Sequence, residues 1–119
     1  MKLKQGDIYW TDFGDDPTCS EPAFKRPCVV IQNNVFNEST INTVVVVPLT
    51  SNLIRASAMG NVLLNKGEAN LSKKSVINIS QIMTVNKSDL YKKIGTLTKQ
   101  RIDELIDGIK LLINPLDLD

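Results

Sequence analysis

Val44-Val45-Val46-Val47 is the stretch that decides the fold of this 119-residue chain. Four β-branched apolar residues in succession strongly favour a β-strand. Because consecutive side chains of a strand point to opposite faces, an apolar run without alternation predicts a strand that is buried on both faces. The sequence therefore predicts a central strand here, in a fold built mainly from β-sheet.

The residues after the valine run predict where this strand ends. Pro48 lacks a backbone N–H and is expected to end the regular pairing. Thr50, Ser51 and Asn52 favour turns, so they are expected to open a loop that ends near Gly60. Hydroxyl and amide groups would then stand at the end of a rigid element, where functional side chains are often placed.

Shorter strands are expected on both sides of the valine run, because β-branched and aromatic residues alternate there with turn-forming residues. These strands cover residues 8–13, 28–32, 62–64, 76–79 and 91–97. Residues 81–85 either continue the strand at 76–79 or pair with it. Residues 14–25 have the composition of a loop, and residues 33–40 that of a turn.

The C-terminal part of the chain has the pattern of an amphipathic helix. From Lys99 onward, apolar residues recur at the spacing i, i+3, i+4 and i+7, with charged residues between them. Thr98 is a suitable N-cap, and Pro115 lies just beyond the expected end. The apolar positions are Ile102, Leu105, Ile106, Ile109, Leu112 and Ile113.

Together these elements predict a single domain that spans residues 1–119. About five to seven short strands and one terminal helix favour a mostly β fold, a small antiparallel barrel with a C-terminal helix. Apolar residues make up 42% of the chain, which is enough for an ordinary core. Trp10 and Cys28, which lie in two of the expected strands, are predicted to belong to that core.

The chain contains no histidine, and this excludes several kinds of chemistry. A Ser-His-Asp triad, a Cys-His pair and a His-ligated zinc site are all impossible. Cys19 and Cys28 fit neither a zinc ligand set nor a disulfide framework, so neither a metal nor another cofactor is expected. The net charge is only +1, so binding of a nucleic acid would depend on a local basic patch.

The chain also has no expected membrane segment. Its N-terminal residues carry charge but lack the apolar segment of a signal peptide, and no apolar run approaches the length of a membrane span. Both cysteines are expected to be reduced. These features predict an intracellular, cytoplasmic protein.

Two segments carry side chains suited to chemistry on a phosphate. The first is Ser20-Glu21-Pro22-Ala23-Phe24-Lys25-Arg26-Pro27, at the junction of a loop and a strand. Pro27 biases Arg26 toward an extended conformation, and the planar guanidinium can donate to two phosphate oxygens at once. Phe24 is the best candidate for stacking on a base. The alternative is that Arg26 is a surface residue paired with a carboxylate such as Glu21.

The second segment is the end of the valine strand. Thr50 and Ser51 can donate hydrogen bonds to a phosphate or to a developing oxyanion. A turn capped by these same side chains is the alternative. Arg55 and the lysine pairs at 73–74 and 92–93 are suited to a nucleic-acid backbone, although solvated surface lysines are common.

Taken in order, these segments resemble the MazF/PemK family of toxins. The blocks that carry the resemblance in the first half of the chain are Gly6-Asp7-Ile8-Tyr9-Trp10-Thr11-Asp12-Phe13, Ser20-Glu21, Lys25-Arg26-Pro27-Cys28-Val29-Val30-Ile31-Gln32-Asn33 and Val46-Val47-Pro48-Leu49-Thr50-Ser51. Residues 60–62, 71–76, 80–82 and 94–97 extend it over nearly the whole chain. Each block alone is a weak signal, whereas the ordered set is specific.

The resemblance implies an SH3-like barrel that forms a homodimer and cleaves single-stranded mRNA sequence-selectively and without a metal. It also implies a cognate antitoxin chain that blocks the RNA groove. Catalysis is assigned to Arg26 and Thr50, with Ser20 and Glu21 beside the site. The residues expected to bind RNA are Ser20, Phe24, Lys25, Ser51, Arg55 and Gln81.

A protein without histidine suits a reaction in which the substrate supplies the nucleophile. We expect the ribose 2′-OH to attack the adjacent phosphorus, which gives a 2′,3′-cyclic phosphate and a 5′-OH end. Arg26 would stabilise charge on the phosphorane oxygens, and Thr50 would donate a second hydrogen bond. Glu21 is the candidate base, or the residue that orients Arg26.

Several positions depart from the family pattern, and two alternatives stay open. Cys19 stands where the family often has Gly, Pro22-Ala23-Phe24 replaces small residues, and Met83 stands where many relatives have Arg. One alternative is a degenerate homologue that binds RNA or antitoxin without cleavage. The other is a binding module that poisons DNA gyrase, as CcdB-like toxins with the same barrel do.

Overall fold

The computed structural model describes residues 2–14 and 25–118. Its strands are β1 (Asp7–Asp12), β2 (Lys25–Val30), β3 (Thr43–Thr50), β4 (Val62–Leu64), β5 (Ser75–Ile77), β6 (Met83–Asn86) and β7 (Leu90–Thr96). The α-helices are α1 (Asn34–Asn37) and α2 (Lys99–Ile113), and the short 3-10 helices are η1 (Leu53–Ser57), η2 (Glu68–Asn70), η3 (Ile79–Gln81) and η4 (Lys87–Asp89).

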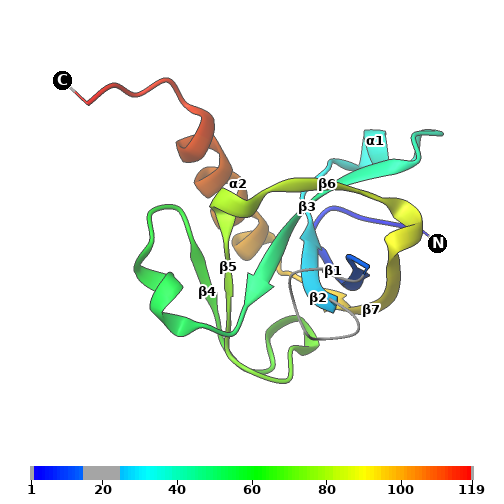
Figure 1. Ribbon diagram of the computed structural model, residues 1–119, viewed down its shortest axis with the longest axis horizontal. Helices are drawn as coiled ribbons and strands as arrows, with labels where there is room; N and C mark the ends of the chain where they lie inside the picture. The colour runs from blue at the N-terminus through cyan, green and yellow to red at the C-terminus, as the bar shows by residue number, and fades with distance from the viewer. Residues whose placement is uncertain (1, 15–24, 119) are drawn as a thin grey trace.

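β3 is the central strand of the sheet, as the valine run predicts. It pairs antiparallel with β2 on one side and with β6 and β5 on the other. The strand order is β4-β5-β3-β2-β1-β7, with β6 joined to β3 outside this path. Figure 1 shows the sheet curling into a half-barrel, while α2 contacts β4 and η3. The prediction of a mostly β antiparallel fold with a C-terminal helix is confirmed.

Pro48 does not end the pairing of β3, and this part of the prediction was wrong. The strand continues to Thr50, because Pro48 lies where β3 changes partners on one side. β6 pairs as far as Val46 and β5 begins at Leu49, so no ladder requires an N–H from position 48. The Pro48 carbonyl still accepts a hydrogen bond of 3.1 Å from the N–H of Asn78.

Two other expectations from the sequence are corrected. The segment 81–85 neither continues nor pairs with β5: its strand, β6, pairs with β3 from Thr43 to Val46. The 3-10 helix η3 separates β5 from β6, so the chain can cross to a different strand. The turn expected at 33–40 contains the short helix α1, because the Asn33 side chain accepts a 3.1 Å hydrogen bond from the N–H of Phe36.

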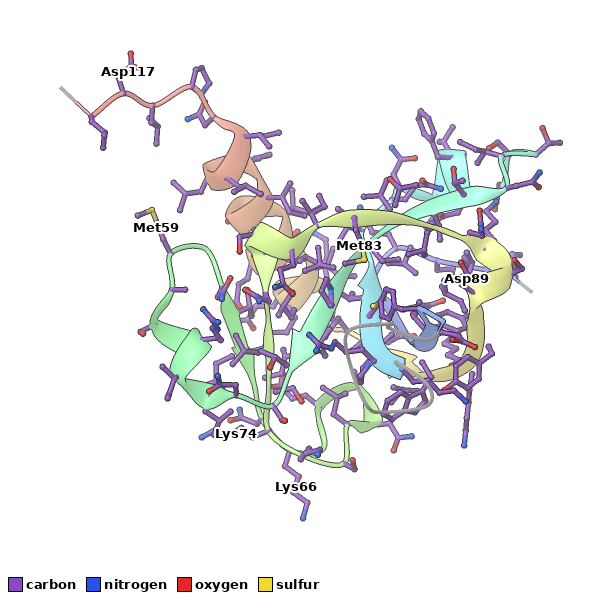
Figure 2. The ribbon with its side chains drawn as sticks, viewed as in Figure 1. Met59, Lys66, Lys74, Met83, Asp89 and Asp117 are labelled. Carbon is purple, nitrogen blue, oxygen red and sulfur yellow. The ribbon has the colours of Figure 1, made fainter. Side chains whose placement is uncertain are left out.

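Both faces of β3 are buried, and each belongs to a different core. The first, which we call the α2-side core, contains Val47 and Leu49 together with Leu105 of α2. The second, the barrel core, contains Val44 and Val46 and lies inside the curled sheet. Met83 of β6 points toward the barrel core (Figure 2). Two cores rather than one therefore account for three of the four valines, while Val45 is only partly buried.

Cys28 is a fully buried free cysteine in the barrel core, as predicted. Its burial raises the pKa of the thiol from 9.0 to about 11. The thiol therefore remains protonated throughout the neutral range and behaves as a small apolar side chain.

α2 begins at Lys99, and Thr98 is its N-cap, as predicted from the sequence. The Thr98 hydroxyl accepts a 3.3 Å hydrogen bond from the N–H of Arg101. Gly108 allows a close approach to the turn before β4, since a Cβ there would overlap the carbonyl of Gly60. In the part of the chain that the structure describes, no helix is long and apolar enough to cross a membrane.

We expect Leu105→Ala to lower the free energy of unfolding by about 2–5 kcal/mol, because it leaves a cavity between α2 and the sheet. Asp107→Ala, at an exposed position of the same helix, is the matched control and should change stability by no more than about 0.5 kcal/mol. Chemical denaturation measures both values. Equal effects of the two substitutions would contradict the packing described for α2.

We also expect Cys28 to resist alkylation by iodoacetamide at pH 8, because the reagent attacks the thiolate. A rise in pKa from 9.0 to about 11 lowers the thiolate fraction about 100-fold. Intact mass spectrometry of a Cys19→Ser variant, with and without denaturant, measures the two rates. Similar rates in the folded and denatured protein would show that Cys28 is not buried.

Candidate functional site

A pocket of about 460 Å³ opens where β2, β3 and β7 meet the segment between β4 and β5. Five cationic side chains line it: Lys25, Arg26, Lys73, Lys92 and Lys93. None of the described residues in its lining is acidic. A chain whose net charge is close to zero therefore has a local basic surface, and such a surface attracts phosphate groups.

Arg26 reaches this pocket from β2. Its backbone is paired with Thr11 of β1, and it is the second residue of β2, so it lies at the start of a strand as expected from the sequence. A hydrogen-bonded strand positions a guanidinium more firmly than a loop does. The next residue, Pro27, also lines the pocket and faces Trp10 across the β1–β2 ladder.

The paired part of β2 and β3 ends close to Arg26 and Thr50. Cys28 pairs with Pro48, and Val29 pairs with Val47. In an antiparallel pair, each step toward the end of one strand is matched by a step along the other. The ladder ends at Cys28 and Pro48, and Arg26 and Thr50 each lie two residues beyond this last pair, where both line the pocket.

Thr50 ends β3 and takes part in a capped turn. Its hydroxyl oxygen accepts a 3.1 Å hydrogen bond from the N–H of Asn52, whose own side chain accepts from the N–H of Ile54 at 3.3 Å. The turn-forming role considered for Thr50 is thus present, but it uses only an oxygen lone pair. The hydroxyl proton can still be donated into the pocket, where Ser51 stands beside it.

Trp10 is not a core residue, contrary to the expectation from the sequence. It is partly exposed and lines the pocket. Ile8, two residues earlier in β1, is fully buried in the α2-side core, so on the face of the strand that carries Ile8 and Trp10 burial decreases toward the pocket. The β1–β7 ladder also shifts register between Trp10 and Thr11. The alternation of apolar and polar residues over 8–13 does not indicate that Trp10 is partly exposed.

Two of the pocket lysines are held by neighbouring side chains. The Lys25 ammonium lies 5.2 Å from the centre of the Tyr91 ring, a cation–π contact. The Lys93 ammonium lies 3.5 Å from a carboxylate oxygen of Asp7, which is buried at the start of β1. These contacts favour particular positions of the two charges before any ligand binds.

The structure does not bring together every residue expected at the site. Arg55 lies in η1 and Gln81 in η3, and neither lines the pocket. Ser20, Glu21 and Phe24 lie outside the described residues. By contrast, Lys25 and Ser51 do line the pocket, next to Arg26 and Thr50.

Asn70, Lys73 and the pair Lys92-Lys93 also line the pocket. From the sequence, the two lysine pairs are expected only as possible contacts with a nucleic-acid backbone, and Asn70 is not singled out. Strand pairing and loop conformation bring these residues to the pocket. The one clue in the sequence was the occurrence of adjacent lysines within an expected strand and before another.

Acidic side chains gather elsewhere. Asp12 and Asp89 line a separate pocket of about 490 Å³, and Figure 2 shows Asp89 at the turn between β6 and β7. Within residues 2–14 and 25–118, no group of three or more His, Cys, Asp or Glu side chains is arranged to hold a metal ion. Among the described residues that line the first pocket, the charged side chains are those of Arg and Lys.

Comparison with known proteins gives a consistent result. Residues 4–113 match the model of the family described as PemK-like, MazF-like toxin of type II toxin-antitoxin system. Endoribonuclease MazF6 of Mycobacterium tuberculosis is 35% identical over 114 residues, which cover 96% of this chain and 99% of the relative. Endoribonuclease EndoA of Bacillus subtilis is 28% identical over 117 residues, or 98% of this chain and 99% of the relative.

Solved structures show the same fold. An endoribonuclease in complex with its cognate antitoxin, from a mycobacterial species, has a TM-score of 0.74 at 22% identity, with 97% of this chain and 99% of that chain covered. The MazE-MazF structure from Deinococcus radiodurans has a TM-score of 0.77 at 15% identity, with 98% and 99% covered. Because the family model and the relatives span nearly the whole sequence, the chain belongs to the PemK-like, MazF-like toxin family of type II toxin-antitoxin systems.

Proposed function

We propose that this chain is the toxin of a toxin-antitoxin pair and an endoribonuclease that cleaves single-stranded RNA in the basic pocket. The observation that carries the proposal is the meeting of Arg26 and Thr50 in a pocket lined by four lysines. The printed names of the curated relatives, which are endoribonucleases, support the same activity.

Binding would begin with the phosphates of the RNA backbone, which the pocket cations neutralise as counterions are released. Trp10 presents an aromatic surface in the same pocket, and an unpaired base can stack on such a ring. A single strand is the suitable substrate because its bases are free to turn toward the protein.

The proposed reaction is an internal transesterification. The 2′-oxygen attacks the adjacent phosphorus, the bond from phosphorus to the 5′-oxygen breaks, and the products are a 2′,3′-cyclic phosphate and a 5′-OH. One proton leaves the 2′-OH and another reaches the departing 5′-oxygen. No metal is required in this scheme, because Arg26 and the neighbouring lysines stabilise the charge that develops on the phosphorane.

Arg26 acts as a donor in this scheme. A guanidinium keeps its proton in proteins, so it is unsuited to accept one from the 2′-OH. The Thr50 hydroxyl donates a second hydrogen bond to the scissile phosphate. Glu21 is proposed as the base or as the group that orients Arg26, since it is the nearest acid in sequence on the N-terminal side of the pocket strand.

The proposed partners are a cognate antitoxin and a second copy of this chain. Solved relatives include an endoribonuclease bound to its cognate antitoxin, and the basic pocket complements an acidic, partly disordered segment of such a chain. The last turn of α2 leaves the side chains of Leu111, Leu112 and Ile113 exposed, and exposed apolar side chains of this kind are suited to a homodimer contact.

We expect Arg26→Ala and Thr50→Ala each to lower the rate of RNA cleavage about 10²–10³-fold, because each removes a donor to the developing charge. Lys110→Ala, an exposed cation on α2, is the control for the general loss of positive charge and should cleave normally. Rates are measured on a fluorescent single-stranded RNA, with circular dichroism to confirm folding. Normal cleavage by both pocket variants would refute the site.

A single 2′-deoxy substitution at the cleaved position should abolish cutting, because it removes the nucleophile. Excess EDTA should leave cleavage of the all-RNA strand unchanged, and the fragments should carry 5′-OH ends that polynucleotide kinase can phosphorylate directly. Intact RNA, combined with inhibition of DNA gyrase by the same preparation, would instead support the gyrase-poisoning alternative. Intact RNA that nevertheless binds the protein would indicate a degenerate homologue.

A further inference from the structure

Residues 67–73, which we call the wall loop, form one wall of the basic pocket through residues 70–73. Its backbone adopts left-handed conformations in close succession: Gly67 has φ 93°, Ala69 has φ 47° and Asn70 has φ 62°. Residues other than glycine rarely adopt such values, and alanine has no polar side chain to compensate locally. Contacts with the rest of the molecule must therefore hold the wall loop in this shape.

Some of these contacts are made with β7. The Asn70 side-chain amide donates a 3.0 Å hydrogen bond to the carbonyl of Ile94. A Cβ at Gly95 would overlap the carbonyl of Ala69, so the loop backbone lies directly on the strand. Leu71 is buried in the α2-side core. The wall loop is thus fixed at its pocket end.

At its other end, the wall loop is held by an ion pair with α2. One Glu68 carboxylate oxygen accepts from Arg101 Nε at 2.8 Å, and the other accepts from Arg101 Nη2 at 2.9 Å and from the N–H of Asn65 at 2.6 Å. The hydrogen bond from Arg101 lowers the pKa of the Glu68 carboxyl. With side chains only 26% and 23% exposed, this two-pronged pair is stronger than an ordinary surface ion pair.

Arg101 is itself fixed to the first turn of α2. Its Nη1 donates a 2.8 Å hydrogen bond to Glu104, one turn further along the helix. Its backbone N–H is capped by Thr98, and the helix is anchored through the fully buried Leu105. The ion pair therefore fixes the position of the wall loop relative to α2, a helix that packs on the core.

We propose that Glu68 and Arg101 are positioning residues, which hold the wall loop so that Asn70, Ser72 and Lys73 can contact the substrate. The pair links α2 to the wall of the pocket across 33 positions of sequence. Neither residue lines the pocket, so the pair acts on substrate binding rather than on the reacting atoms. This inference rests on the proposed function for its kinetic consequence, but its structural part can be measured separately.

The test compares Glu68→Ala, Arg101→Ala and the conservative Glu68→Gln with a matched control, Glu104→Ala. The control removes a carboxylate from the same arginine but leaves the link to the wall loop intact. For the two alanine variants at the pair we expect KM for single-stranded RNA to rise about tenfold, the equivalent of roughly 1.4 kcal/mol, with kcat changed less than about twofold. Glu68→Gln should retain part of the affinity, and Glu104→Ala nearly all of it.

A second readout does not depend on cleavage. Hydrogen exchange of the Asn70 and Leu71 amides, which are bonded to Gly67 and Glu68 within the loop, should accelerate at least tenfold in Glu68→Ala and Arg101→Ala, but not in Glu104→Ala. Amides of β3 should be unaffected. A purely stabilising role would instead speed exchange everywhere and leave KM unchanged in the folded fraction.

The possible failures are distinguishable. If the wild-type protein cleaves no RNA, the proposed function is wrong, and the exchange data alone decide whether the pair holds the wall loop. If the wild-type protein cleaves RNA but the pair variants keep its KM, or if Glu104→Ala raises KM equally, the positioning role is overturned. Unchanged exchange in the wall loop of Glu68→Ala would overturn it as well.

Discussion

The burial of β3 on both faces is the constraint on which the rest of this structure depends. One face faces the barrel core and the other the α2-side core, so this single strand holds two packed layers together. If the pairing of β3 slipped by one residue, the side chains of its two faces would exchange places. The free-energy cost of that exchange fixes the register with β2. That register in turn places the ends of the two strands together, so that Arg26 and Thr50 both line the pocket just beyond the ladder.

The basic pocket is therefore a product of long-range pairing rather than of one loop. β2 and β3 supply Arg26 and Thr50, β1 supplies an aromatic ring and β7 supplies lysines. The fourth side is the wall loop, which reaches its place through β7 and through the ion pair to α2. Core packing thus determines the arrangement of donors, and this arrangement is what a charge-stabilising site requires.

Much of this fold could be predicted because the relevant patterns are local. The valine run, the period of α2, its Thr98 cap and the burial of Cys28 each follow from a few neighbouring residues. The partner of β6, the exposure of Trp10 and the place of Asn70 could not be predicted, because each depends on pairing between distant segments. For the same reason, residues that matched in sequence order, such as Gln81, do not all meet at the pocket.

The position of β7 at the margin of the sheet has a consequence for solubility. Among the described strands β7 pairs only with β1, so apart from Ile94 and Gly95, which the wall loop contacts, its other side presents backbone groups to which a strand from another molecule could add. Lys92 and Lys93 lie within this strand, and lysines on an edge strand discourage such intermolecular pairing through charge repulsion and desolvation. The charges that equip the pocket for a polyanion thus also oppose aggregation through the edge strand. Replacing both lysines would therefore weaken the charge of the pocket and the resistance to aggregation together.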